Sequence, residues 1–168
     1  MENKNITVSI QIRTMDMFRF FMKHFYSGFS GIFGLVLSFG AFIFLMLTFE
    51  SRDSFQVIIL VILASLFTVI QPIQFLTKAY QQVKMMPIYK APIDYVLDEN
   101  GIHVKQNEET LDLPWKNMRK VAEGSKALYI YTSSVHAFIF PKDQLSGNEE
   151  TVKILLKEKV GMDKCKLK

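Results

Sequence analysis

The chain has 168 residues, 49% of them hydrophobic, and a formal net charge of +4. This length is about one domain, and 15 Phe and 9 Met make the chain unusually apolar for a soluble protein of that size. The single cysteine, Cys165, excludes an internal disulfide framework and any metal site built from several cysteines.

The first pattern is a strict alternation of polar and apolar residues over residues 5–12, "NITVSIQI". Its apolar members are Ile6, Val8, Ile10 and Ile12. A period of two predicts a strand with one buried face. Because a single strand cannot bury that face alone, we expect the N-terminal segment, residues 1–13, to join a sheet formed by the C-terminal region.

A helix is expected next, with Thr14 as its N-cap and Asp16 in its first turn. Several phenylalanines accompany Arg19 and Lys23 in this helix. Such a composition is typical of a membrane interface, where aromatic rings lie among headgroups and cations extend toward water.

Two long uncharged segments dominate the first half of the chain. Residues 25–49 comprise 25 residues without a charge and residues 54–77 another 24, each longer than the roughly 20 residues that a helix needs to cross about 30 Å of hydrocarbon. They predict transmembrane helices at about residues 27–49 and 55–77, joined by the tight turn "ESRDS". With helical extensions, the predicted membrane hairpin covers residues 14–90.

The charges around the hairpin predict its orientation. The turn carries Glu50, Arg52 and Asp53, whereas lysines and arginines flank the two open ends. Because cations favour the cytoplasmic side, we expect a multi-pass protein of the cell membrane with both termini in the cytoplasm. Residues 1–90 hold 8 basic and 4 acidic residues, and residues 91–168 hold 12 of each. The positive charge is therefore a topology signal and does not indicate nucleic acid binding.

Ser30, Gly34 and Ser38 recur at every fourth position of the first span. Rows of small residues let two helix backbones approach closely. We favour packing against the second span of the same hairpin, and a seam between copies in a homo-oligomer is the alternative. Pro72 predicts a kink in the second span. Neither span contains Asp, Glu, Lys or Arg, so a proton relay or a path for a charged substrate has no residues to use.

The period changes to two in the C-terminal region, residues 91–168. Residues 93–97 and 102–105 alternate on either side of "ENG", which predicts a β-hairpin. Further strands are expected in "ETLDLPW", "MRKVAE", "ALYIYT" and "HAFIF", and an amphipathic helix in "EETVKILLKEKV". These elements predict a membrane α+β protein whose cytoplasmic domain is a small β-barrel or bent sheet closed by the C-terminal helix.

A more specific pattern runs through "YVLDENGI", "LPWKNMRKV", "ALYIYTSSVHAFIFPKDQL" and the final helix. Its most distinctive positions are Asn100, Gly101, Trp115, Phe140, Pro141 and Lys142. This pattern, with the two spans, resembles the YcxB-like family of bacterial membrane proteins over nearly the whole chain. The resemblance implies a pleckstrin-homology-like barrel that acts as a binding or regulatory module, without catalytic residues or a cofactor.

Trp115, the only tryptophan, has two interpretations. It shares a predicted strand face with Leu111 and Leu113, so we favour a core residue whose N–H is bonded locally. In the alternative, it forms a patch for a lipid headgroup or a partner together with Lys116, Arg119 and Lys120. One departure weakens the alternative, because the hairpin turn that is cationic in phosphoinositide-binding pleckstrin domains is acidic here.

No histidine pair has metal-ligand spacing, and no phosphate loop or nucleophile elbow is present in the sequence. We therefore expect no enzyme, no metal and no cofactor. The predicted function is a binding or regulatory module for a protein or peptide partner, held at the bilayer by the hairpin. The alternative is an oligomeric membrane-protection or immunity-type protein that acts through its transmembrane helices.

Overall fold

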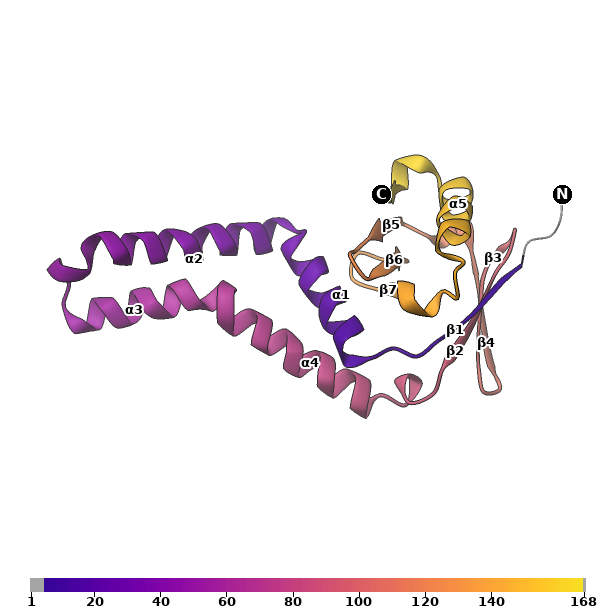
Figure 1. Cartoon of the computed structure of the whole chain (residues 1–168), viewed down its shortest axis with the longest axis horizontal. Helices are drawn as coiled ribbons and strands as arrows, with labels where there is room; N and C mark the ends of the chain where they lie inside the picture. Colours follow the sequence, from indigo (N-terminus) through magenta and orange to yellow (C-terminus); the bar gives the residue numbers. More distant parts are fainter. Residues whose placement is uncertain (1–4, 168) are drawn as a thin grey trace.

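The computed structural model describes residues 5–167, so the outermost residues of the predicted segments 1–13 and 91–168 lie outside the described residues. The chain forms a long helical hairpin and a β domain at the open end of that hairpin (Figure 1). The first strand precedes the hairpin in sequence and all other strands follow it. The hairpin is thus inserted between the first two strands of the β domain.

Two bent arms of consecutive helices form the hairpin: α1 (Thr14–Tyr26), α2 (Phe29–Thr48), the short η1 (Phe49–Ser51), α3 (Ser54–Ser65), the π-helical η2 (Leu66–Ile70) and α4 (Gln71–Met85). α2 packs along α3, and α1 packs along α4. The helical stretches Phe29–Ser51, of 23 residues, and Ser54–Met85, of 32 residues, are long and apolar enough to cross a membrane. Most of their large apolar side chains are exposed.

Each of the two arms of the hairpin is bent (Figure 1). In the first arm, Gly28 separates α1 from α2. In the second arm, the bend is at η2, just before Pro72, whose ring and missing N–H do not fit a regular α-helix. The two bends are bonded to each other, because the hydroxyl of Tyr26 donates to the carbonyl oxygen of Phe67 at 2.5 Å. The predicted kink near Pro72 is confirmed.

The start of α1 differs by one residue from the prediction. Thr14 is the first helical residue, and Arg13 is the N-cap. The carboxylate of Asp16 explains this start, because it accepts a hydrogen bond from the backbone N–H of Arg13 at 3.1 Å. The guanidinium of Arg13 also pairs with Asp143 at 2.8 Å. The beginning of the hairpin is therefore attached to the β domain.

The first sheet contains four antiparallel strands in the order β1 (Ile6–Ile10), β2 (Ile93–Leu97), β3 (Gly101–Gln106) and β4 (Glu109–Pro114). In the pairing of β1 with β2, Ile6 lies opposite Leu97 and Ile10 opposite Ile93. This pairing confirms that the N-terminal strand joins the C-terminal region. The β2–β3 turn requires Gly101, since a Cβ there would lie 2.2 Å from the carbonyl oxygen of Leu113.

The second sheet has the order β7 (Ala137–Pro141), β6 (Ala127–Tyr131), β5 (Lys120–Glu123) and β8 (Cys165–Lys166). β8 pairs with β5 in parallel, whereas the other pairs are antiparallel. The helix α5 (Glu149–Val160) has the bounds that its sequence predicts. The remaining elements are the short 3-10 turns η3 (Pro87–Tyr89), η4 (Trp115–Asn117), η5 (Lys142–Gln144) and η6 (Met162–Lys164).

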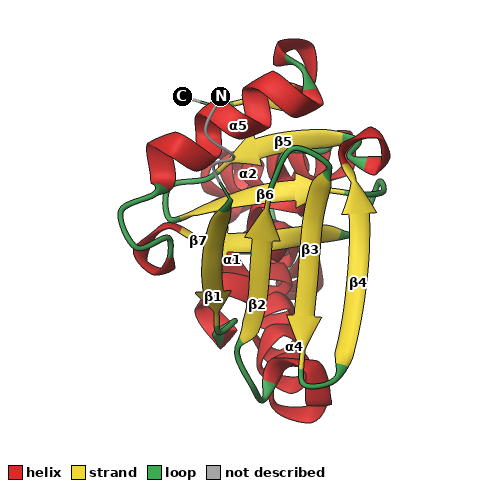
Figure 2. Ribbon diagram, turned by 90° about the vertical axis from the view of Figure 1, so that its right-hand side faces the viewer, coloured by secondary structure: helices red, strands yellow, loops and turns green. Residues whose placement is uncertain are grey.

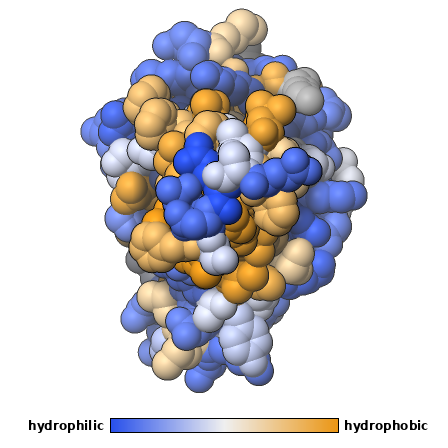
Figure 3. All heavy atoms as spheres, turned by 90° about the vertical axis from the view of Figure 1, so that its left-hand side faces the viewer, coloured by the Kyte–Doolittle hydropathy of each residue, from blue (hydrophilic) through white to orange (hydrophobic). Residues whose placement is uncertain are grey.

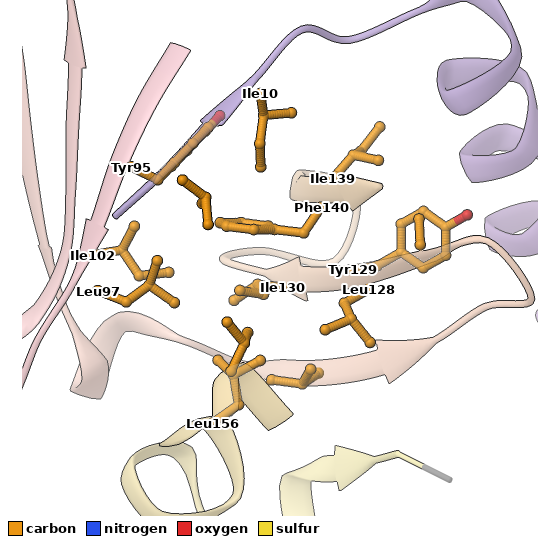
Figure 4. Packing of buried hydrophobic residues seen from close by; sticks show 14 of the residues in the cluster. Ile10, Tyr95, Leu97, Ile102, Leu128, Tyr129, Ile130, Ile139, Phe140 and Leu156 are labelled. Carbon is orange, nitrogen blue, oxygen red and sulfur yellow. The ribbon is translucent and has the colours of Figure 1, made fainter. Parts of the chain in front are cut away.

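The strands of one sheet run across those of the other (Figure 2), and the main core lies between the sheets (Figure 4). Tyr95 of β2 and Phe140 of β7 meet there, with ring centroids 4.9 Å apart. α5 adds the buried side chains of Val152, Leu156 and Val160. The N-terminal strand contributes Ile6, Val8 and Ile10, the face that its alternation predicts to be buried.

Of the two predicted forms, a small β-barrel or a bent sheet, the barrel is wrong. Among residues 5–167, the strands form two separate sheets, and no strand pair joins one sheet to the other. The reason lies at the crossing point between β4 and β5. Pro114 lacks a backbone donor and is followed by the turn η4, so the chain leaves the first sheet before it enters the second.

Candidate functional site

Trp115 lies in η4 and not on a strand with Leu111 and Leu113, contrary to the prediction. Pro114 ends β4, and the chain turns so that the indole is 7% exposed while Leu111 is 53% exposed. The indole Nε1–H donates to the carbonyl oxygen of Asp98 at 2.9 Å. This bond joins η4 to the turn between β2 and β3. The structure therefore places Trp115 in the core of the β domain.

The three cations after Trp115 are exposed but lie in different settings. Lys116 is on the turn η4, and Arg119 precedes β5 and donates its backbone N–H to the carbonyl oxygen of Tyr131 at 2.7 Å. Lys120 begins β5, and its Nζ lies 4.4 Å from the ring centroid of Tyr131. Of the three, Lys120 alone lines a pocket among those described.

That pocket, called the basic pocket below, lies between the bend of the first arm and the outer face of the second sheet. Its volume is about 400 Å³. Its basic residues come from three separate parts of the chain: Lys23 and His24 from α1, Lys120 from β5 and Lys166 from β8. Ser27 and Gly28, at the break between α1 and α2, complete one side.

Strand register explains why the cations of the second sheet gather there. Lys120 lies opposite Tyr131, and Ala122 lies opposite Lys166. Because alternate residues of a strand point to opposite faces, Lys120 and Ala122 face the hairpin, while Val121 faces the core. Tyr131 packs against α1 through Phe20, with ring centroids 6.1 Å apart, which holds α1 against this face.

None of the described residues that line the basic pocket is acidic. Within residues 5–167, Lys23, Lys120 and Lys166 form no salt bridge. Burial, followed by the charge of Lys120, lowers the pKa of His24 below 6.5. The positive charge of the pocket at neutral pH therefore comes from its lysines.

Of the three residues in the predicted small-residue seam, Gly34 and Ser38 pack against the second arm of the hairpin and Ser30 does not. Gly34 faces η2, where a Cβ would lie 2.4 Å from the ring of Phe67. Ser38 is fully buried and bonds to the second arm. Ser30 is exposed, and its neighbour Gly31 takes the buried position next to α1. Gly34 and Ser38 thus pack as the favoured interpretation expects, and Ser30 lies off that face.

β4 is one of the two outer strands of the first sheet, and no described element lies beside its free edge (Figure 2). An apolar groove of about 430 Å³ adjoins this strand and includes Ile88, Ile93, Val104 and Leu111. On the strand itself, a carboxylate oxygen of Asp112 lies 2.6 Å from Nδ1 of His103, and one of Asp98 lies 3.1 Å from Nε2. The two carboxylates make the imidazolium form favourable.

A cluster of four charged residues ties α5 to the second sheet. Lys153 lies 3.1 Å from Glu123 of β5 and 2.9 Å from Glu149 of α5. Lys142 of η5 contacts both of these carboxylates. Bonds to Lys142, then to Lys153, lower the pKa of Glu149. Periodicity alone predicts Lys153 to be solvated, but its position next to Val152 places it at the edge of the buried stripe, 8% exposed.

No group of three His, Cys, Asp or Glu side chains within the described part of the chain could hold a metal ion. His136, in the loop before β7, contacts the hydroxyl of Ser133 at 3.0 Å and has no second titratable neighbour in a described bond. Cys165 donates to the carbonyl oxygen of Leu156 at 3.4 Å. These side chains have structural partners, and the basic pocket and the β4 edge are the two candidate binding surfaces.

A family comparison covers part of these two surfaces, including Lys120 of the basic pocket and all of β4. The model of the family described as YcxB-like protein matches residues 97–154, from the end of β2 into α5. This segment is similar to that family. The match contains Trp115, the charged cluster around Lys142 and the whole of β4, and it confirms the resemblance there. The hairpin lies outside the match, and no curated protein matches the chain.

Proposed function

We propose that the YcxB-like chain is a multi-pass protein of the cell membrane, with the hairpin in the bilayer and both termini in the cytoplasm. The observation that supports this placement is the exposed apolar surface of α2 and α3. Phe33, Phe42 and Ile58 are each more than half exposed, and such a continuous apolar surface requires a cover. Figure 3, viewed along the hairpin, has apolar atoms around its tip and hydrophilic atoms of the β domain behind them.

The β domain has a pleckstrin-homology-like fold in this proposal. Four antiparallel strands, β1–β4, cross three antiparallel strands, β5–β7, and the C-terminal helix α5 packs at the open end of the core. This order and the YcxB-like match support the assignment. The hairpin is then an insertion between the first and second strands, which places the domain directly against the membrane surface.

The function that we propose for this domain is non-catalytic binding of a protein or peptide partner at the edge of β4. An unpaired edge strand offers a row of backbone donors and acceptors to an extended peptide, and neighbouring apolar pockets select its side chains. The exposed Leu111 and the groove that it shares with Ile88 and Val104 supply such a pocket. This combination of a free edge and an adjacent groove carries the proposal.

Photo-crosslinking in living cells tests the proposal. A photoreactive residue at Leu111, 53% exposed on β4, is compared with one at Ile154, 63% exposed on the outer side of α5. We expect a discrete protein adduct from position 111 and none from position 154. Adducts of equal yield from both positions, or only self-adducts, would contradict a specific partner at β4.

A second candidate function, an oligomer of membrane-protection or immunity type, has support from the hairpin. An apolar groove of about 400 Å³ runs along the outside of α2 and α3, lined by Phe33, Leu37, Gly40 and Phe44. A Cβ at Gly40 would meet no atom within 4 Å. Such a groove accepts a helix from a second copy, and function that survives disruption of the β domain would favour this candidate.

A further inference from the structure

We propose that the basic pocket binds the phosphate group of an anionic phospholipid headgroup. This inference rests on the proposed placement of the hairpin in a membrane, but it does not depend on the proposed partner site at β4. The pocket is defined by Lys23, His24, Lys120 and Lys166, with Ser27 and Gly28 at its side.

The location of the pocket decides between a lipid and other sources of phosphate. Gly28 is the N-cap of α2, and the apolar span begins one residue later. With the span in the bilayer, the pocket lies at the level of the headgroups. A ligand that enters it from the membrane side meets Lys23 and Lys120 without leaving the interface.

The chemistry of the pocket suits an anion. Three lysines from three elements converge, and none of them is paired with a carboxylate within residues 5–167. Ammonium groups near an anionic leaflet attract its headgroups. α2 begins beside the pocket, at its N-cap Gly28, and the N-terminus of a long helix favours a phosphate.

Tyr131 gives the pocket a fixed floor. It is buried, pairs with Lys120 across the sheet and lies under the ammonium group of that lysine. The ring of His24 lies 5.9 Å from that of Tyr131. Burial, followed by the charge of Lys120, lowers the pKa of His24 and so favours the neutral imidazole, which can donate one hydrogen bond to a phosphate oxygen. The lysine stems and the two rings thus form a shaped site on a rigid strand and helix.

The test uses the full chain purified in detergent, titrated with phosphatidylglycerol and followed by native mass spectrometry. Lys120→Gln and Lys23→Gln each remove one pocket cation, and Lys116→Gln, outside the pocket, removes an equal charge as the matched control. A single interfacial cation contributes about fivefold in affinity. We therefore expect each pocket variant to weaken phosphatidylglycerol binding about fivefold, while the control changes it less than twofold.

Titrations with two further ligands make the outcome of this experiment decisive. Phosphatidylcholine should bind more weakly than phosphatidylglycerol, and glycerol phosphate should compete poorly, because it lacks the acyl chains that lie along α2. Equal losses in all three variants, or no loss in either pocket variant, would overturn the proposal. Tight binding of glycerol phosphate with the same dependence on Lys120 would overturn the lipid assignment. Resistance of every variant to carbonate extraction tests the membrane placement separately.

Discussion

Ser38 of α2 accepts a hydrogen bond from the backbone N–H of Phe67 at 3.2 Å, inside the π-helical turn η2. Its hydroxyl also donates to the carbonyl oxygen of Leu63 at 3.0 Å. A π-turn widens the helix and displaces backbone groups from their usual partners. One small side chain of the first arm therefore satisfies two backbone groups of the second arm at the bend.

Replacement of Ser38 with alanine is expected to destabilise the hairpin by about 1 kcal/mol, because the N–H of Phe67 loses the Ser38 acceptor and the carbonyl of Leu63 keeps only its bond from the N–H of Leu66. Ser30→Ala is the matched control, since Ser30 is exposed on the same helix. Thermal unfolding of the full chain in detergent, followed by circular dichroism at a helix band, measures the difference. Equal melting temperatures for the two variants would contradict the role of Ser38.

Replacement by leucine is expected to destabilise the hairpin at Gly34 but not at Gly40, two glycines of α2. In Gly34→Leu, the new side chain collides with the ring of Phe67, so the arms separate and the hairpin loses at least about 2 kcal/mol. In Gly40→Leu, the side chain points into open space and stability stays within about 0.5 kcal/mol. If the outer groove joins two copies, Gly40→Leu also lowers the oligomeric mass measured by light scattering. A folded Gly34→Leu hairpin of normal stability would show that this packing is not required.

His103 is expected to make the β domain less stable at alkaline pH. The hydrogen bond with Asp112, followed by that with Asp98, raises the pKa of His103 above 6.5, against an opposite effect of burial. Its stabilising contribution is fully present below pH 6.5 and is lost as the pH rises through the higher folded-state pKa. The contribution stays below about 1 kcal/mol, since the pair is partly exposed.

The fluorescence of Trp115, the only tryptophan, reports the unfolding of the β domain. Melting temperatures of the parent chain and of His103→Gln are compared at pH 6 and pH 8.5. The parent should lose more stability than the variant between these two values. Parallel losses would mean that His103 is not the titrating group.

The charged cluster at α5 predicts that replacing Glu123 lowers the stability of the chain more than replacing Glu150 does. Glu123→Gln leaves Lys142 and Lys153 with Glu149 as their one shared carboxylate, and should cost about 2 kcal/mol, less than the roughly 3–5 kcal/mol of a deeply buried pair. Glu150→Gln removes a contact at a side chain that is 79% exposed, and should cost below about 0.5 kcal/mol. Urea unfolding followed by Trp115 fluorescence separates the two. Equal losses in the free energy of unfolding for the two variants would show that the charged cluster does not stabilise the β domain.

Local patterns predicted much of the fold because their physical cause is local. The alternation from Ile6 to Ile10 predicted both a strand and the need for a partner, and β2 supplies it. The stripe of Val152 and Leu156 predicted the bounds of α5. Trp115 was assigned to a strand face because the alternation through Leu111 and Leu113 was extended across Pro114, although a proline there is a signal that the strand ends.

The basic pocket could not be predicted in the same way. Lys23, Lys120 and Lys166 come from the hairpin and from two non-consecutive strands, and the register of β5 with β6 and β8 brings them together. Within the sequence, Lys120 was grouped with its neighbours Lys116 and Arg119. Chain proximity suggested one patch, whereas the pairing of strands places Lys120 on the face toward the hairpin.

Cysteine labelling in intact cells tests the orientation of the hairpin. In a Cys165→Ser background, Ser51→Cys places a thiol at the exposed turn between the spans and Ser125→Cys places one in the exposed β5–β6 turn. We predict that a membrane-impermeant maleimide labels S51C in intact cells and labels S125C only after lysis. Labelling of S125C in intact cells, or protection of both thiols until lysis, would contradict the proposed topology.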